Sequence, residues 1–184
     1  MNKAVVFSFL ILGISTAWSQ ADSVCNPSFE TGLTDWQNFA NNGAVATFDT
    51  SAVAATEGAV GVVIDIQDVS VGTCVLSACI ADMYANQTYR MSFWAKSDNA
   101  VEVLATISKA SPGYNNYASA NVVLSSDWVQ YEISGSVADD LLSDVRLAKF
   151  KFLSEGTVMI DDIQIDICLL YTSPIPRDSI PSRM

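Results

Sequence analysis

Strict alternation of apolar and polar residues in short runs is the feature that most constrains the fold of this chain. In the run AVGVVIDIQD, one face would carry Val60, Val62, Ile64 and Ile66. A period of two residues is that of a strand with one buried face, and no stretch beyond the N-terminal segment sustains a helical period. Turn-forming clusters such as KSDN, SPGYNN and LSSD separate the runs. The pattern predicts an all-β sandwich of antiparallel strands.

The same alternation recurs in three further runs, at residues 89–96, 101–108 and 128–134. In the first run the odd-numbered residues from Tyr89 to Ala95 are apolar, so we expect them to face the core. Trp94 then lies on the outer face of the strand, between Arg90 and Lys96.

Two later runs change parity in the middle. The apolar face passes from Leu147 to Phe150 in the first, and from Ile160 to Ile163 in the second. A shift of one residue predicts a β-bulge in each strand. The second bulge falls on the DD pair at 161–162, and adjacent carboxylates in an apolar strand either point to water or coordinate a cation.

Both ends of the chain are predicted to lie outside the folded domain. Residues 1–19 combine a lysine, an apolar run too short to span a bilayer and small residues, which is typical of a secretory signal peptide. We therefore expect a secreted protein, extracellular or on the cell surface, without a membrane span. Residues 168–184 lack alternation and hold three prolines, and their first seven residues are those that a base string resembling a transposase adapter from sequencing libraries would encode. We interpret them as non-native read-through, although a natural proline-rich linker fits their composition too. One domain, residues 20–167, remains, and the true gene would continue past Ile167.

The charge of the domain disfavours nucleic acid and anionic lipid as partners. The full chain has 9 basic and 20 acidic residues, a net charge of −11. Without Lys3, Arg177 and Arg183 there are 6 basic residues, and without Asp178 there are 19 acidic ones, so residues 20–167 carry −13. A field of that sign repels polyanions but not a neutral polysaccharide. Histidine is absent, which excludes His-dependent nucleophile pairs and His-ligated zinc or iron.

Three cysteines, Cys25, Cys74 and Cys79, lie within the domain. At most one disulfide can form among them in an oxidising compartment. A bond between Cys74 and Cys79 would require a turn at residues 76–78, and the sequence leaves the pairing open.

Four segments occur in a familiar order: NPSFETGLTDW, YRMSFWAKS, LSSDWVQYEIS and GTVMIDDIQI. In this the chain resembles the jelly-roll carbohydrate-binding modules of the cellulose- and xylan-binding type, called CenC-like, over nearly all of residues 20–167. The resemblance implies a jelly-roll β-sandwich with a structural calcium at one edge and a glycan cleft on the concave sheet.

The resemblance also assigns the calcium ligands. They are Glu30, from the Phe-Glu pair of the first segment, and Asp161, the first acid of the Asp-Asp pair, with backbone carbonyls from the turn at 56–58. Calcium accepts carboxylate and carbonyl oxygens from distant segments. Phe29 would pack inward beside Glu30. The alternative is that Glu30 is a solvated turn acid and Asp162 a surface charge.

Glycan sites of this kind place flat aromatic rings against sugar faces, and polar groups against the hydroxyls. The residues that we predict to bind carbohydrate are Trp94, Arg90, Tyr114 and Tyr117. An alternative is that another strand or the N-terminal loop covers Trp94. Trp36 and Trp128 match family positions that usually pack structurally.

The expected function is a non-catalytic polysaccharide-binding module, of β-glucan or xylan type, attached to a secreted glycoside hydrolase whose catalytic domain would follow Ile167. Two alternatives stay open. One is a calcium-stabilised structural or adhesion sandwich of a cell-surface protein. The other is a glycosidase, which needs two carboxylates and no histidine, although no motif places an acid deep in a cleft. No catalytic residue is predicted.

Overall fold

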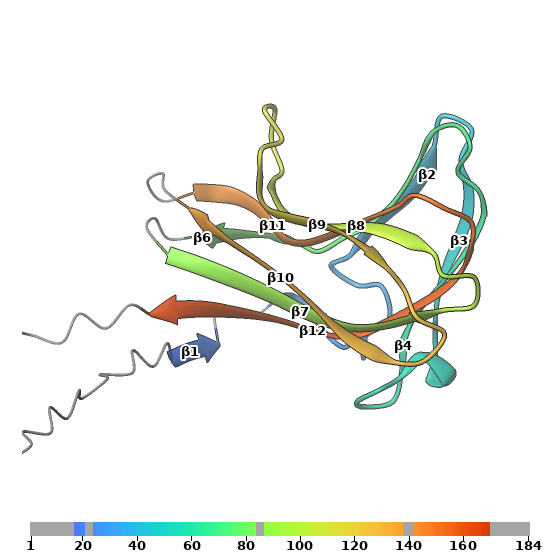
Figure 1. Cartoon of the computed structure of the whole chain (residues 1–184), viewed down its shortest axis with the longest axis horizontal. Helices are drawn as coiled ribbons and strands as arrows, with labels where there is room; N and C mark the ends of the chain where they lie inside the picture. The colour runs from blue at the N-terminus through green and yellow to red at the C-terminus, as the bar shows by residue number, and fades with distance from the viewer. Residues whose placement is uncertain (1–16, 21–23, 84–86, 138–141, 170–184) are drawn as a thin grey trace, which may run out of the picture.

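The computed structural model describes residues 17–20, 24–83, 87–137 and 142–169, which form two antiparallel sheets packed face to face (Figure 1). The first sheet has the order β10-β7-β12-β4-β3, with β1 also paired to β12. Its strands are β1 (Ala17–Gln20), β3 (Val45–Ser51), β4 (Gly61–Asp68), β7 (Gln87–Ser97), β10 (Val129–Val137) and β12 (Gly156–Leu169).

The second sheet has the order β2-β5-β11-β8-β9, with β6 also paired to β11. Its strands are β2 (Gln37–Asn41), β5 (Thr73–Ser77), β6 (Ile80–Met83), β8 (Glu102–Lys109), β9 (Asn116–Val123) and β11 (Leu142–Phe152). The short 3-10 turn η1 (Ala52–Ala54) is the helical element of the described residues. The predicted all-β sandwich is confirmed. Among the described residues, no helix has the length and apolar character needed to cross a membrane.

The core lies between the two sheets and consists of the residues that alternation assigned to it. On β7 Tyr89, Met91, Phe93 and Ala95 are each at most 2% exposed, and on β8 Ile107 is fully buried. Each large apolar side chain removed from water contributes about 1.5–3 kcal/mol to folding. The predicted faces of β4, β7 and β8 are therefore confirmed.

Both predicted bulges are present. The register of β11 shifts between Arg146 and Lys149, and that of β12 shifts between Asp161 and Gln164. At the second bulge Asp162 has a φ of 46°, a left-handed conformation that asparagine and aspartate tolerate better than most residues. The bulge lets Ile163 return to the core while Asp161 stays on the outer face beside Trp94, its register partner on β7.

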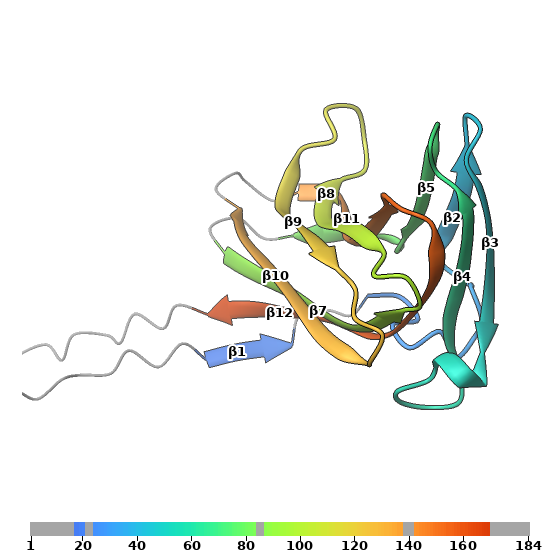
Figure 2. The ribbon, with the colours of Figure 1, turned by 45° about the vertical axis from the view of Figure 1, so that its right-hand side comes forward.

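Strand β12 continues two residues past the predicted domain boundary. Cys168 pairs with Thr88 on β7, and Leu169 pairs with Ala17 on β1 (Figure 2). The expectation that residues from 168 onward lack regular structure is therefore wrong for Cys168 and Leu169, because backbone pairing does not require side-chain alternation. Strand β1 includes residues 17–19 of the predicted signal peptide. The rest of that segment, 1–16, and the rest of the predicted tail, 170–184, lie outside the described residues.

One disulfide joins Cys25 to Cys79, and so ties the N-terminal segment to the connection between β5 and β6. Cys74 is free and buried on β5. The expectation of at most one disulfide within the domain is confirmed for these three cysteines, and the structure decides the pairing that the sequence left open.

Candidate functional site

The turn that follows η1 folds over the outer face of β12 and binds the carboxylate of Asp161. The Oδ2 atom of Asp161 accepts hydrogen bonds from the backbone N–H of Thr56 at 2.5 Å and of Glu57 at 3.0 Å. It accepts a third from the Thr56 hydroxyl at 2.9 Å. Asp161 is fully buried as a result. Three donors on one oxygen hold the carboxylate in a single orientation.

The same turn binds Glu30. Its Oε1 atom accepts from the backbone N–H of Ala59 at 2.8 Å and of Val60 at 3.2 Å. Phe29 is fully buried, as predicted, and its φ of 56° directs the next residue away from the core. The structure thus brings both predicted metal ligands, Glu30 and Asp161, to one turn.

Gly58 lies in the turn between the amides that bind Asp161 and those that bind Glu30, and its backbone approaches the Glu30 carboxylate closely. Its φ is +68°, and a Cβ on its backbone would lie 2.1 Å from Oε1 of Glu30. The positive φ favours glycine, and a Cβ there would require the Glu30 carboxylate to shift. The turn therefore packs its backbone directly against Glu30.

One oxygen in this arrangement has no partner: Oδ1 of Asp161 is buried and accepts no hydrogen bond. Leaving a buried polar atom unsatisfied costs about 1–3 kcal/mol, and more when it is charged. A cation at Oδ1 would remove that cost. No third acidic, histidine or cysteine side chain joins the two carboxylates within the described part of the chain. Oxygen ligands alone suit a hard cation such as calcium better than zinc, and two carboxylates would need carbonyls and water to complete its shell.

A cavity of about 520 Å³ adjoins this turn on the outer face of the first sheet. It is lined by Ala55, Thr56, Glu57, Trp94, Trp128 and Asp162. Its size is within the range of small-molecule sites. The ammonium of Lys96 lies 5.0 Å from the centre of the Trp128 ring, within cation–π range. A smaller cavity of about 220 Å³ is lined by Lys96, Ser97, Asp98, Ser126, Thr157 and Met159.

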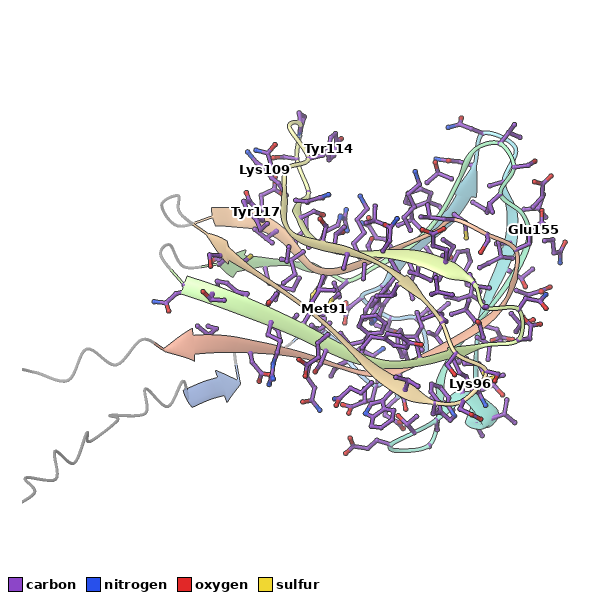
Figure 3. The ribbon with its side chains drawn as sticks, viewed as in Figure 1. Met91, Lys96, Lys109, Tyr114, Tyr117 and Glu155 are labelled. Atoms are coloured by element: carbon purple, nitrogen blue, oxygen red, sulfur yellow. A yellow bond between two sulfur atoms is a disulfide. The ribbon has the colours of Figure 1, made fainter. Side chains whose placement is uncertain are left out.

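The structure does not bring the other predicted sugar contacts to this cavity. Arg90, on the same face of β7, forms ion pairs with Asp166 at 2.5 Å and Glu132 at 3.4 Å. Tyr114 lies near the tip of the β8–β9 hairpin, on the opposite side of the molecule from Lys96 (Figure 3). It is 64% exposed, whereas Tyr117 is half-buried against the core. The four predicted residues are therefore divided between the two sheets.

The two remaining tryptophans of the domain differ from each other. Trp36 is 6% exposed, its ring centroid lies 4.8 Å from that of Phe29, and its indole N–H donates to the Asn26 carbonyl at 3.0 Å. Its predicted packing role is confirmed. Trp128 was expected to pack structurally as well, yet it lines the larger cavity. The cavity around Trp128 is completed by the turn at 55–57, some 70 residues earlier in the sequence. Nothing in the sequence around Trp128 indicates that contact.

Three comparisons with known proteins are informative. A family model described as Carbohydrate binding domain, CBM_4_9, matches residues 21–148. No curated protein matches the chain. The enzymatically active domain of bacteriophage CBA120 tailspike protein 4 superposes with a TM-score of 0.64 at 19% identity, covering 79% of this chain but only 21% of the tailspike chain.

Two similar structures match over nearly their whole length. A CBM4 structure has a TM-score of 0.60 at 18% identity, covering 79% of this chain and 99% of the other. The CBM22-1 xylan-binding domain from Paenibacillus barcinonensis Xyn10C has a TM-score of 0.56 at 17% identity, covering 82% and 97%. At these identities the structural similarities concern the fold alone.

Proposed function

Because the chain belongs to the carbohydrate binding domain family CBM_4_9, we propose that it is a non-catalytic module that binds a polysaccharide of the β-glucan or xylan type. The observation that carries this proposal is the cavity on the first sheet, which exposes Trp94 and Trp128 together. The narrower CenC-like assignment stays a prediction.

The lining of this cavity has the chemistry that sugars require. Indole rings offer flat apolar faces to the C–H groups of a pyranose, and neighbouring polar groups bind its hydroxyls. The carboxylates of Glu57 and Asp162 are acceptors for such hydroxyls, and the Thr56 hydroxyl adds a further polar group. Asp162 is held in place by two contacts with the Gln164 amide, at 2.9 and 3.0 Å.

A second cavity on the same face favours a polysaccharide chain over a single sugar as the ligand. Trp94 and Lys96 both project from the outer face of β7, and each lines one of the two cavities. Trp128 and Ser126, two residues apart, also lie in one cavity each. A glycan that ran along this edge of the sheet would meet both cavities in succession.

The test is affinity gel electrophoresis in gels that contain β-glucan or xylan. Trp94→Ala and Trp128→Ala should each weaken binding by about 1–3 kcal/mol, which is five- to more than a hundredfold, from the loss of one aromatic contact. Tyr114→Ala is the matched control, because it removes an exposed aromatic ring on the opposite side. Retardation that survives both tryptophan substitutions would move the site elsewhere. No retardation by either polysaccharide would favour the adhesion alternative.

We further propose that the turn at 56–60 contains a structural calcium ion bound by Glu30 and Asp161. The unpartnered Oδ1 of Asp161 and the backbone packing at Gly58 support this. When bound, the ion would supply charge compensation for two carboxylates. Without the ion, Glu30 in the N-terminal segment and Asp161 on β12 are already linked, because both bind amides of this turn. The same turn forms one wall of the cavity.

We also propose that the module is secreted and tethers a glycoside hydrolase to its substrate, with the catalytic domain beyond Ile167. The Cys25–Cys79 disulfide supports an oxidising compartment, because such bonds are rare in reducing cytosol. Sequencing the gene past the codon for Ile167 tests whether a catalytic domain follows the module.

A further inference from the structure

The larger cavity on the first sheet combines two indole rings with two carboxylates. Trp94 projects from β7, Trp128 immediately precedes β10, Asp162 lies on β12, and Glu57 lies in the turn that follows η1. The face of an aromatic ring carries negative potential, as a carboxylate does. No lysine or arginine is among the described residues that line this cavity. Its lining therefore favours a positively charged group in the ligand.

The bulge in β12 places a charged group beside the cavity. Asp161 turns its carboxylate to the amides of Thr56 and Glu57 and is fully buried, whereas Asp162, with a φ of 46°, is half-buried and lines the cavity. The hydrogen bonds of the Asp162 carboxylate come from the neutral amide of Gln164, at 2.9 and 3.0 Å. They hold the carboxylate in place and leave its negative charge uncompensated.

Glu57 contributes a second carboxylate that no cation neutralises. Its side chain is exposed, and its backbone N–H is fixed on Asp161 at 3.0 Å, so the residue stays at the rim of the cavity. The ion pairs found in the described part of the chain both belong to Arg90, and neither involves Glu57 or Asp162. Two unpaired carboxylates thus lie beside two indole rings.

One of these rings already binds an ammonium group. The Nζ atom of Lys96 lies 5.0 Å from the centre of the Trp128 ring, which is a cation–π distance. Lys96 belongs to the lining of the smaller cavity, where Asp98 provides an opposite charge. The smaller cavity therefore has no clear charge preference of its own. The preference for a cation comes from the larger cavity, and the net charge of −13 on residues 20–167 extends it over a longer range.

We propose that the glycan bound in the larger cavity is a β-1,4-linked glucan with free amino groups at C2, as in deacetylated chitin. This rests on the proposed function and narrows the β-glucan ligand to a cationic one. Its ammonium groups pair with Asp162 and Glu57, while its sugar rings lie against Trp94 and Trp128. The substituents of a β-1,4-glucan are equatorial, so the ammonium groups lie at the ring edge and leave the C–H faces free for the indoles.

The physical advantage over a neutral glucan lies in the charge of the donor. A hydroxyl at C2 gives a carboxylate an ordinary hydrogen bond, whereas an ammonium group gives a charge-assisted one that is roughly twice as strong. A carboxylate that loses water on binding is better compensated by a cation than by a hydroxyl. Asp162 is already half-buried and oriented by Gln164, so little of its freedom is lost when a ligand binds.

The experiment is titration calorimetry with three hexasaccharides that share the β-1,4 backbone and differ at C2. They are the hexamers of glucosamine, N-acetylglucosamine and glucose, in a mildly acidic buffer that keeps the amines protonated. The parent should bind the glucosamine hexamer at least about fivefold more tightly than either neutral hexamer, since each exposed ion pair contributes a factor of about two to five. This advantage should shrink at high salt, because salt screens exposed charges.

Variants identify the carboxylates responsible. Glu57→Gln combined with Asp162→Asn should weaken binding of the glucosamine hexamer roughly four- to twenty-fivefold, by loss of two ion pairs, and should leave binding of the glucose hexamer nearly unchanged. Asp82→Asn combined with Asp144→Asn is the matched control, because it removes the same charge from the second sheet, on β6 and β11. Unchanged melting temperatures verify that both double variants fold.

Each outcome bears on one of the two proposals. Equal or tighter binding of a neutral hexamer overturns the preference for a cationic glucan and leaves the proposed function in place. Equal loss in the two double variants would mean that the acidic domain attracts any polycation, and overturns the proposal as well. Binding of the glucosamine hexamer that survives Trp94→Ala would place it outside the cavity. Absence of binding by all three hexamers, with xylan binding retained, overturns this inference alone; loss of xylan binding too overturns both.

Discussion

Removal of the proposed calcium ion should destabilise the domain at the turn that binds Asp161 and Glu30. The Oδ2 atom of Asp161 keeps three hydrogen bonds from Thr56 and Glu57 without metal, but its buried Oδ1 atom is left without a partner. A ligand that binds only the folded state stabilises it by about 2.7 kcal/mol when present at a hundredfold its dissociation constant. For a domain of this size each kcal/mol shifts the melting temperature by about 2–4 °C. A chelator should therefore lower it by about 5–11 °C.

Asp161→Asn separates metal loss from loss of the turn contacts. The asparagine carbonyl can still accept from the Thr56 and Glu57 amides, while its amide group occupies the unpartnered position without charge. The variant should melt near the chelated parent, and the chelator should no longer affect it. Glu30→Gln should behave in the same way, because its carboxylate binds the adjacent part of the turn.

Differential scanning calorimetry of parent and variants, with and without chelator, provides the assay. Asp162→Asn is the matched control: it removes the neighbouring charge, whose contacts are with the Gln164 amide, and should keep the full chelator effect. A parent melting temperature that does not respond to the chelator would refute the reasoning. It would mean that the turn amides alone compensate both carboxylates.

Three further predictions concern stability. Cys79→Ala, assayed by urea unfolding, should lower the free energy of unfolding by about 2–4 kcal/mol, because Cys25–Cys79 closes a long loop, and an unchanged midpoint would contradict this. Burial raises the pKa of Cys74 to about 11 from 9.0, so its contribution to stability is complete below pH 9 and is lost as the pH rises to about 11. In calorimetric scans the melting temperature of the parent should therefore fall relative to that of Cys74→Ala across that window, and a constant difference between the two would contradict this. Truncation after Leu169 should leave the melting temperature unchanged, since residues 170–184 are expected to contribute nothing, and a clear drop would show that the tail is native.

The fold could be predicted from the sequence because side-chain period and burial are directly linked in a strand. Alternation assigned Met91 and Phe93 to the core, and the parity shift at Asp161 located a bulge. Parity states which residues share a face, but it does not state which sheet a strand joins. Trp94 and Tyr114 were therefore predicted for one cleft, although Trp94 lies on β7 of the first sheet and Tyr114 lies between β8 and β9 of the second.

The candidate metal site shows a different limit. The resemblance paired Glu30 with Asp161, and the structure attaches both to one turn. The amides that bind them come from residues 56–60, more than 100 positions from Asp161 in sequence, and nothing local encodes that contact. Gly58 is the one signal present in the sequence, and its need for a positive φ and close packing is visible only after folding.

The clustering of Arg146, Lys149 and Lys151 on β11 was not predicted, for a similar reason. Net charge is a sum over the whole domain, so a value of −13 does not indicate that three cations lie on one strand. None of these three forms an ion pair with a described residue. Arg146 and Lys149 are separated by a bulge, and only the bulge places them on the same face. Trp128 was likewise assigned to packing because its cavity depends on the turn at 55–57.

The central claim is that a glycan binds against Trp94 and Trp128, and tryptophan fluorescence during titration with soluble β-glucan and xylan oligosaccharides tests it most directly. Trp36 is buried on Phe29 and should not respond to the ligand. We predict a saturable blue shift in the parent that falls by half or more in Trp94→Phe and in Trp128→Phe and disappears in the double variant. Saturable binding measured by calorimetry with no change in emission, or with equal affinity in the double variant, would contradict the account.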